Sequence, residues 1–328
     1  MEGMIIMITN NVSHRRRGYK TYYLKTRNGQ KTVISYIMLL PVIIGFLVFT
    51  LYPMLWVFSK AFYYYVGVPQ TQRFIGFENF INLFKSDVGY WKAWITTFQF
   101  AIIKLPIEFS LAVILAVFLN RKMKGVAFFR GVYFMPQILS VAIIGLIFAN
   151  MFDYFGLING ILQKLGIISE GYDWFSTKKS AMTVLVIGSV WQNFGVNTLY
   201  VLAGLQNIDE DLYEAAYIDG ASKFRAFWSI TLPLLAPILQ IIILLGINGT
   251  LQVNDYVLVM TNGAPGGATN TIMSYLTKKF MPGFATEATI NIGYGSAVYM
   301  VTSCICCMVA LFYNKLSNKL SNKLSNLY

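Results

Sequence analysis

Charged residues are scarce in this sequence. They make up 12% of its 328 residues, and only 14 of them are acidic. Soluble domains carry about 25% charged residues, so this chain has too few ions to cover a water-exposed surface. Hydrophobic residues instead reach 56%, and the mean hydropathy is +0.56. The composition therefore predicts an all-α, polytopic membrane protein and excludes one or two ordinary soluble domains.

Metal-ligating side chains are also scarce. The sequence holds one histidine, His14, and three cysteines, Cys304, Cys306 and Cys307. A structural metal ion needs about four converging ligands, and these residues cannot supply them, because His14 lies in a basic stretch and the cysteines lie in one apolar run. We expect no metal site, and we expect the thiols to pack against helices or lipid.

Long apolar runs, in contrast, are abundant. A helix needs about 20 apolar residues to cross about 30 Å of hydrocarbon, and six stretches qualify. These runs cover residues 33–58, 93–119, 132–152, 181–205, 232–260 and 290–313. The first run is too long for a cleavable signal peptide, and no small-residue cleavage site follows it. We therefore predict six transmembrane helices.

Basic residues are distributed unequally between the two sides of these runs. With the N-terminus inside, 16 of the 26 Lys and Arg residues fall on the cytoplasmic side and nine on the other, with Lys104 inside a run. Loops rich in Lys and Arg stay in the cytoplasm, so both termini are predicted to lie there. The formal charge of +12 thus reflects topology in a cell membrane and contact with its lipid, and nucleic-acid binding is not expected.

The runs divide the chain into four regions. They are a basic cytoplasmic tail at 1–32, the first helix with an external loop at 33–92, a helical core at 93–313, and a cytoplasmic tail at 314–328. The last region repeats Lys-Leu-Ser-Asn, and this four-residue period places Leu316, Leu320 and Leu324 on one side of a helix. We expect a solvated or interfacial extension there.

The connection at 206–231 differs from the other loops because it is acidic on the side that should be basic. Asp209 is a predicted N-cap, and acids follow it in the first turn, where the helix dipole favours them. Gly220 permits a break, and Ser222 can cap a second short helix that ends before Leu232-Pro233. We predict a compact helix–turn–helix at the cytoplasmic membrane face.

One set of residues in this connection carries a specific resemblance. The set is Glu214-Ala215-Ala216, Asp219-Gly220, Ile230 and Leu232-Pro233, each at its defining spacing. It resembles the EAA loop of permease subunits of binding-protein-dependent ABC importers, where the loop is the coupling helix that docks into the ATPase. The resemblance implies that Glu214 faces a basic residue of the ATPase and that Gly220 allows the sharp turn. An ordinary amphipathic interfacial helix is the alternative.

Other stretches resemble the maltose-permease-like sugar branch of that family. They are Arg130-Gly131 with Phe134, Pro136 and Ser140, the segment Gly156-Leu157-Ile158-Asn159, Asp219-Gly220-Ala221 with Phe227, and Asp255 with Thr261, Gly263 and Pro265. Asn254 and Ala264 depart from the branch pattern, which has Phe and Gly there. The resemblance covers nearly the whole chain after the basic tail.

The resemblance implies a MetI-like, type I importer fold and the uptake of a carbohydrate. The implied partners are a second permease subunit, two copies of an ATPase subunit and an extracytoplasmic sugar-binding protein. ATP and Mg would be used by the ATPase, and no cofactor would be bound by this chain. We therefore expect a transport subunit and not an enzyme.

Polar side chains inside apolar runs are costly, and they usually face a cavity or another helix. Amides beside aromatic rings suit a hydroxyl-rich ligand, although they can also simply join helices. The candidates for the substrate pathway are Trp191, Gln192, Asn193 and Asn197 on the fourth run, and Asn248, Gln252, Asn254, Asp255 and Tyr256 on the fifth. Lys104 and Glu108 lie four residues apart, so they can neutralise each other or, alternatively, form part of an ion path.

Other functions stay open at this point. A related importer could carry another small solute, such as glycerol phosphate. A secondary transporter usually shows internal repeats, and no repeated half is visible here. A membrane-embedded enzyme needs converging catalytic groups, and only Lys104 and Glu108 interrupt the runs near mid-depth. A Gly-rich phosphate loop is also missing from the sequence, so ATP hydrolysis is not expected of this chain.

Overall fold

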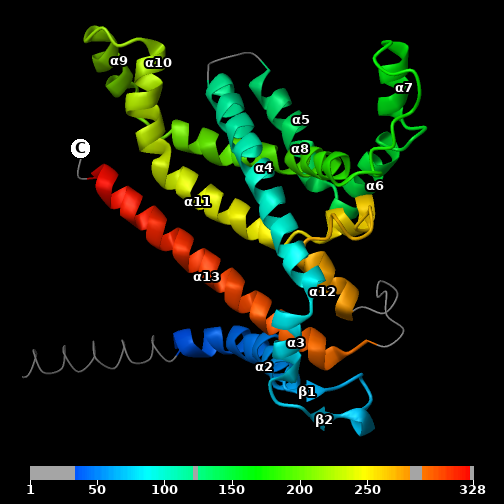
Figure 1. Cartoon of the computed structure of the whole chain (residues 1–328). Helices are drawn as coiled ribbons and strands as arrows, with labels where there is room; N and C mark the ends of the chain where they lie inside the picture. Colours follow the sequence, from blue (N-terminus) through cyan, green and yellow to red (C-terminus); the bar gives the residue numbers. More distant parts are fainter. Residues whose placement is uncertain (1–33, 121–124, 281–289, 326–328) are drawn as a thin grey trace, which may run out of the picture. The chain divides into compact units, whose positions relative to one another are not determined.

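The computed structural model describes residues 34–120, 125–280 and 290–325, and these residues are mostly helical (Figure 1). The predicted basic tail at 1–32, with His14, lies outside the described residues. The chain divides into two compact units, Met1–Ser59 and Lys60–Tyr328.

In the first unit the described residues belong to one apolar helical span. The span runs from Ile34 and continues to Lys60, through a π-helical turn, η1 (Leu47–Leu51), and into α2 (Tyr52–Lys60). The predicted run at 33–58 is therefore helical over its described length. No residue of η1 or α2, all of which are described, is buried within the chain. Apolar side chains without protein cover are typical of a helix that faces lipid.

The second unit begins with a small two-stranded sheet followed by a helix. Strands β1 (Tyr63–Tyr64) and β2 (Arg73–Phe74) pair antiparallel, with the 3₁₀ turn η2 (Pro69–Thr71) between them, and α3 (Glu78–Lys85) follows. Asn79 is buried and donates to the carbonyl oxygens of Ala61 and Tyr63, at 2.9 and 3.1 Å. These bonds attach α3 to the segment that precedes it.

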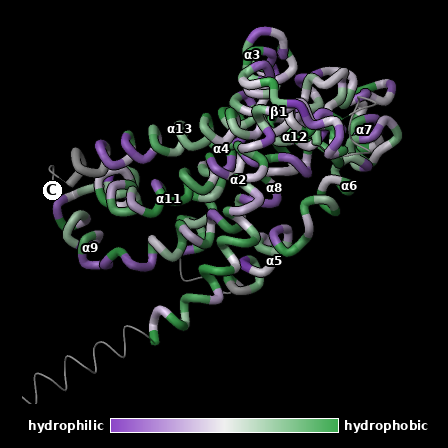
Figure 2. The backbone as a smooth tube through the Cα atoms, turned by 90° about the horizontal axis from the view of Figure 1, so that it is seen from below, coloured by the Kyte–Doolittle hydropathy of each residue, from purple (hydrophilic) through white to green (hydrophobic). Residues whose placement is uncertain are grey.

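The core of this unit is a bundle of helices. Helix α4 (Val88–Leu119) packs along α8 (Lys178–Leu205), and α11 (Leu232–Leu251) packs against both. Beyond them lie α12 (Ile272–Phe280) and α13 (Ile292–Ser325). Hydrophilic residues gather around α3 and β1 and again at α9 (Glu210–Ile218), and hydrophobic residues dominate along the helices between them (Figure 2).

The third predicted run, 132–152, is not one straight helix. It forms α5 (Val126–Ile138) and α6 (Val141–Met151), which are bent by 96° at the break between them. Leu139 is extended, and the Ser140 hydroxyl caps α6 by accepting from the amide of Ile143. A residue that caps a new helix ends the old one, so Ser140 accounts for the break.

The fifth predicted run, 232–260, is also interrupted. Helix α11 ends at Leu251, Gln252 leaves the helical conformation, and a separate π-helical turn, η4 (Val257–Thr261), follows. The polar cluster that begins at Asn248 thus marks the end of a helix. The sixth predicted run, 290–313, is helical from Ile292, and α13 continues through the Lys-Leu-Ser-Asn repeat to Ser325.

Four of the described helical stretches are long and apolar enough to cross a membrane. They are Ile34–Lys60, Val88–Leu119, Lys223–Leu251 and Ile292–Lys319, and the bent pair Phe128–Ile138 with Val141–Met151 makes five if it counts as one span. The fourth predicted run forms α8, a helix of 28 residues that is not among those apolar spans.

Candidate functional site

The acidic connection forms the predicted helix–turn–helix. It consists of α9 (Glu210–Ile218), α10 (Lys223–Ala226) and the π-helical turn η3 (Phe227–Thr231), which leads directly into α11. It lies at the opposite end of the second unit from α3 and β1 (Figure 1). The C-terminal end of α13 lies at the same end as α9 in both views (Figures 1 and 2).

Gly220 makes the turn between the two short helices. Its φ is +81°, a left-handed conformation that side chains with a Cβ rarely adopt. The Ala221 amide donates to the carbonyl of Ala216 at 2.9 Å, and the Gly220 amide donates to the carbonyl of Tyr217 at 3.1 Å. This pair of bonds is the Schellman motif, which ends a helix at a glycine. The glycine of the EAA pattern therefore ends α9 and turns the chain toward α10.

Of the two predicted N-caps, Asp209 and Ser222, only one makes its capping hydrogen bond. Ser222 caps α10, because its hydroxyl accepts from the Arg225 amide at 3.3 Å. Asp209 occupies the N-cap position of α9, but its side chain makes no capping hydrogen bond. A link that the sequence did not reveal joins α9 to η3, where the hydroxyl groups of Tyr213 and Thr231 lie 2.9 Å apart.

Helix α9 is covered only a little by the described residues of this chain. None of its nine residues, all of which the structure describes, is buried. Glu214 and Ala215 are exposed, Ala216 is half-buried, and Ile218 is 86% exposed. A helix this short is marginal in water without tertiary packing, and three of its large apolar side chains, Leu212, Tyr217 and Ile218, are exposed.

The rest of the EAA pattern lies where α9 and α10 join the membrane helix. Ile230 and Leu232 are half-buried around the buried Thr231, and Pro233 falls in the first turn of α11. Proline has no amide donor, and the π-helical turn η3 directly precedes α11. From Lys223 the helix runs without a break through α10 and η3 into α11 and ends at Leu251.

Two of the predicted pathway residues are buried in hydrogen bonds inside the chain. The Tyr256 hydroxyl donates to Oε1 of Gln192, and the Gln192 amide donates to the carbonyl of Leu139 at 3.0 Å. That carbonyl lies at the break between α5 and α6, where the helical ladder leaves it free. Gln192 thus supplies a hydrogen-bond donor for the free Leu139 carbonyl and links this break to Tyr256.

A third candidate, Asn197, takes part in a buried ionic cluster. Lys104 Nζ lies 3.0 Å from Oε2 of Glu108, and Asn197 donates to Oε1 of Glu108 at 2.5 Å. Both charged side chains are almost fully buried. The predicted contact between Lys104 and Glu108 is confirmed, and it includes an amide from α8 that the spacing on α4 could not reveal.

The remaining candidates are more accessible. Asn193 and Asn254 are half-buried, and Asn193 donates to the carbonyl of Ser189 at 2.8 Å. Four others are exposed: Trp191, Asn248, Gln252 and Asp255. Asn248 accepts from Gln252 at 2.8 Å, and the Trp191 ring lies 5.6 Å from that of Phe148. These side chains keep hydrogen-bonding groups or ring faces free to meet a ligand.

Two of the sequence motifs form rigid turns beside the bundle. Asn159 is 1% exposed, donates to the carbonyls of Asp153, Tyr154 and Tyr172, and accepts from the Trp174 indole at 3.0 Å. A single amide therefore holds the loop that contains Gly156–Asn159 together.

The second motif lies between η4 and α12. Thr261 accepts from the Gly263 amide at 3.1 Å, and Lys278 donates to the carbonyl of Asn262 and to the side chain of Asn270. Gly263 has a φ of +82°, and a Cβ there would collide with Asn270 and Lys278. Burial lowers the pKa of Lys278. The Thr261-x-Gly263 pattern thus forms a turn that hydrogen bonds from the Gly263 amide and Lys278 hold in place.

The sequence matches a known family. Residues 108–322 match the family described as the inner membrane component of binding-protein-dependent transport systems. The chain belongs to this family, whose members are transport subunits and not enzymes.

Individual relatives are similar over most of their length. The permease MalF of the trehalose/maltose transport system of Thermococcus litoralis is 33% identical, over 86% of this chain and 92% of its own. The lactose transport permease LacF of Rhizobium radiobacter is 33% identical, over 84% and 91%. The arabinooligosaccharides transport permease AraP of Bacillus subtilis is 34% identical, over 88% and 89%.

A solved structure shares the fold. It is a chain of a bacterial ABC transporter involved in the import of the acidic polysaccharide alginate, with a TM-score of 0.77, 22% identity, and coverage of 89% of this chain and 97% of its own. The chain therefore has the MetI-like fold of ABC importer permeases, and it is a membrane component with several spanning helices.

Proposed function

We propose that this chain forms half of the transmembrane pathway of an ABC importer that takes up a sugar or oligosaccharide. The observation that carries the proposal is the largely exposed α9, which bears the EAA residues and leads directly into α11. The names of relatives that match most of the chain at 33–34% identity support the carbohydrate as substrate.

The proposed topology has six spans, with both termini in the cytoplasm and the core at 93–313. The bent pair α5–α6 is the third span and α8 is the fourth. The presence of α9 and the C-terminal end of α13 at one end of the unit supports this arrangement, because both are then cytoplasmic.

The proposed partners are a second permease subunit, two copies of an ATPase subunit and an extracytoplasmic sugar-binding protein. The ATPase binds ATP and Mg, and this chain binds neither. Closure of the ATPase dimer pulls on α9, and α11 moves against its counterpart in the second permease. A cavity then opens outward and receives sugar from the binding protein.

Within this pathway we assign sugar contact to the half-buried Asn193 and to four exposed candidates, Trp191, Asn248, Gln252 and Asp255. An aromatic face and free amide or carboxylate groups match a hydroxyl-rich ligand. Gln192, Tyr256 and Asn197 instead hold helices together through the buried bonds described above. Asn254, which accepts from Thr277 at 3.1 Å, supports the end of α11.

Replacement of Glu214 tests the proposed coupling. A charge-assisted hydrogen bond contributes about 1.5–3 kcal/mol, so Glu214→Ala should weaken ATPase association by about 10- to 150-fold or uncouple hydrolysis from transport. The measurement is sugar-stimulated ATP hydrolysis and uptake by the complex in liposomes. Glu210→Ala is the matched control, because Glu210 is an exposed acid on the same helix outside the EAA pattern. Equal, near-normal activity of both variants would contradict the coupling role.

A further inference from the structure

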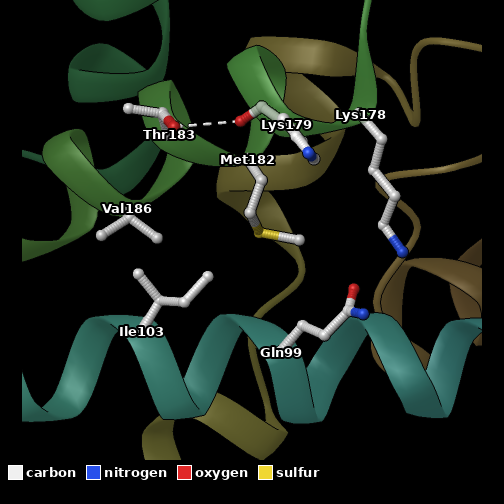
Figure 3. A pocket seen from close by; sticks show the side chains of 7 residues that line it. All are labelled: Gln99, Ile103, Lys178, Lys179, Met182, Thr183 and Val186. Carbon is white, nitrogen blue, oxygen red and sulfur yellow. Dashed lines mark hydrogen bonds between the residues drawn. The ribbon is translucent and has the colours of Figure 1, made fainter.

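A cavity of about 470 Å³ lies between α4 and α8, and neither Gln192 nor Tyr256 is among the residues that line it. Its two ends differ in chemistry (Figure 3). At one end lie the ammonium groups of Lys178 and Lys179 with the amide of Gln99, and at the other Ile103 and Val186 face each other. The thioether of Met182 lies between the ends. The cavity is therefore amphipathic along its length.

No carboxylate of the described residues neutralises the cations at its polar end. Lys178 Nζ donates to the Thr96 hydroxyl at 3.1 Å, which uses one of its three donors. Neither Lys178 nor Lys179 forms an ion pair with a described carboxylate. Two adjacent ammonium groups at the mouth of a cavity attract an anion.

The surroundings of the cavity are apolar and exposed. Ile103 is 45% exposed, Ile102 beside it on α4 is 71% exposed, and Ile187 on α8 is 42% exposed. Isoleucines that a spanning helix leaves uncovered are solvated by lipid chains. The apolar end of the cavity is thus continuous with the surface of α4 that faces the bilayer.

We propose that this cavity binds an anionic phospholipid of the outer leaflet. The phosphate lies between Lys178 and Lys179, and an acyl chain packs against Ile103, Met182 and Val186. A sugar fits less well, because the described side chains that line the cavity include no aromatic ring. The assignment to the outer leaflet rests on the topology proposed above, whereas lipid binding itself does not.

The bound lipid also has a mechanical consequence. It contacts α4 and α8, the two helices that pack most extensively in the core. Lys178 links both helices to the loop before α12, because Thr96 in turn donates to the carbonyl of Ala268 at 3.3 Å. A lipid held there braces the outer ends of these elements against each other.

The test measures lipid retained by the detergent-purified importer complex in native mass spectrometry. The complex is supplied with phosphatidylglycerol or with zwitterionic phosphatidylcholine. The wild type should retain phosphatidylglycerol at least fivefold better than phosphatidylcholine. Lys178→Gln with Lys179→Gln should abolish that preference. Its control, Lys92→Gln with Lys164→Gln, removes two exposed charges elsewhere on the second unit and should keep the preference.

A second pair of variants tests the cavity without changing charge. Ile103→Trp should fill it and reduce phosphatidylglycerol retention at least fivefold, whereas Ile102→Trp, outside the lining, should not. Equal retention by Ile103→Trp and Ile102→Trp would overturn the proposal. The proposal would also be overturned if inorganic phosphate or glycerol phosphate stabilised the wild type against heat as much as phosphatidylglycerol does. The site would then bind soluble anions. ATP hydrolysis by the same preparations, followed separately, reports on the proposed function.

Discussion

Gly220 turns the chain between α9 and α10 in a left-handed backbone conformation. At a φ of +81° a residue with a Cβ pays about 1–2 kcal/mol, although nothing lies within 4 Å of the position that a Cβ would take. The cost of substitution is therefore strain in the turn and not a steric clash with another element. We expect such strain to alter the turn and thereby the position of α9.

We expect Gly220→Ala to reduce sugar-stimulated ATP hydrolysis several-fold, and Gly220→Val, which is β-branched, to reduce it further. Membrane insertion and complex yield, measured by size-exclusion chromatography, should stay normal because the residue is exposed. Gly160→Ala is the control, since Gly160 lies within a helix with open space around it. Full activity of Gly220→Val would show that the Schellman turn is dispensable.

The Lys104–Glu108–Asn197 cluster makes a second prediction at this scale. Removing one partner of a buried ion pair leaves a charge without compensation and costs about 3–5 kcal/mol. Lys104→Met alone should therefore lower the thermal midpoint of the purified complex more than Lys104→Met combined with Glu108→Gln, which keeps an acceptor for Asn197. A double-mutant cycle by differential scanning fluorimetry measures the coupling. Additive effects of the two substitutions would contradict it.

At the scale of elements, one carboxylate joins three helices near α3. Asp87 caps α4 by accepting from the Tyr90 amide at 3.0 Å, and it also accepts from the hydroxyls of Tyr275 on α12 and Tyr294 on α13. Lys279 lies 5.6 Å from the centre of each of these tyrosine rings. Burial alone would raise the pKa of Asp87, but the hydrogen bonds and the charge of Lys279 outweigh it and lower the pKa.

This lowered pKa predicts a pH dependence. An acid whose pKa falls on folding stabilises the fold above its unfolded pKa, near 3.9, and that contribution is lost as the pH drops through the folded value. Asp87→Asn should therefore destabilise the complex at pH 7, and the difference from the wild type should shrink below about pH 4. Thermal unfolding between pH 7 and pH 3 measures this. A difference that stayed constant with pH would assign the effect to packing.

The whole molecule is best tested through its topology. In a variant without Cys304, Cys306 and Cys307, Lys223→Cys should react with a membrane-impermeant maleimide only from the cytoplasm, and Lys178→Cys only from outside. Lys122, which was predicted to lie on the cytoplasmic side, is outside the described residues. Labelling of Lys223→Cys from the exterior would invert the proposed topology and remove α9 from the ATPase.

The sequence alone determined the features that depend on local composition and spacing. The apolar runs predicted where helices lie, because about 20 apolar residues span a bilayer wherever they occur. The residue types at Gly220 and Ser222 predicted a turn and a cap there, since caps and left-handed turns depend on residues close together in the chain. The MetI-like fold followed from the resemblance of the EAA residues.

Only the tertiary structure decided which distant residues meet. The third run is broken at Ser140 into two helices that are bent by 96°, and α11 ends at Leu251. Gln192 is hydrogen-bonded to Tyr256, and Asn197 is hydrogen-bonded to Glu108. The partners in these bonds lie 64 and 89 residues apart in the chain, so no local period relates them. An intramembrane amide must find a partner somewhere, and the packing of α4 against α8 determines which partner is within reach.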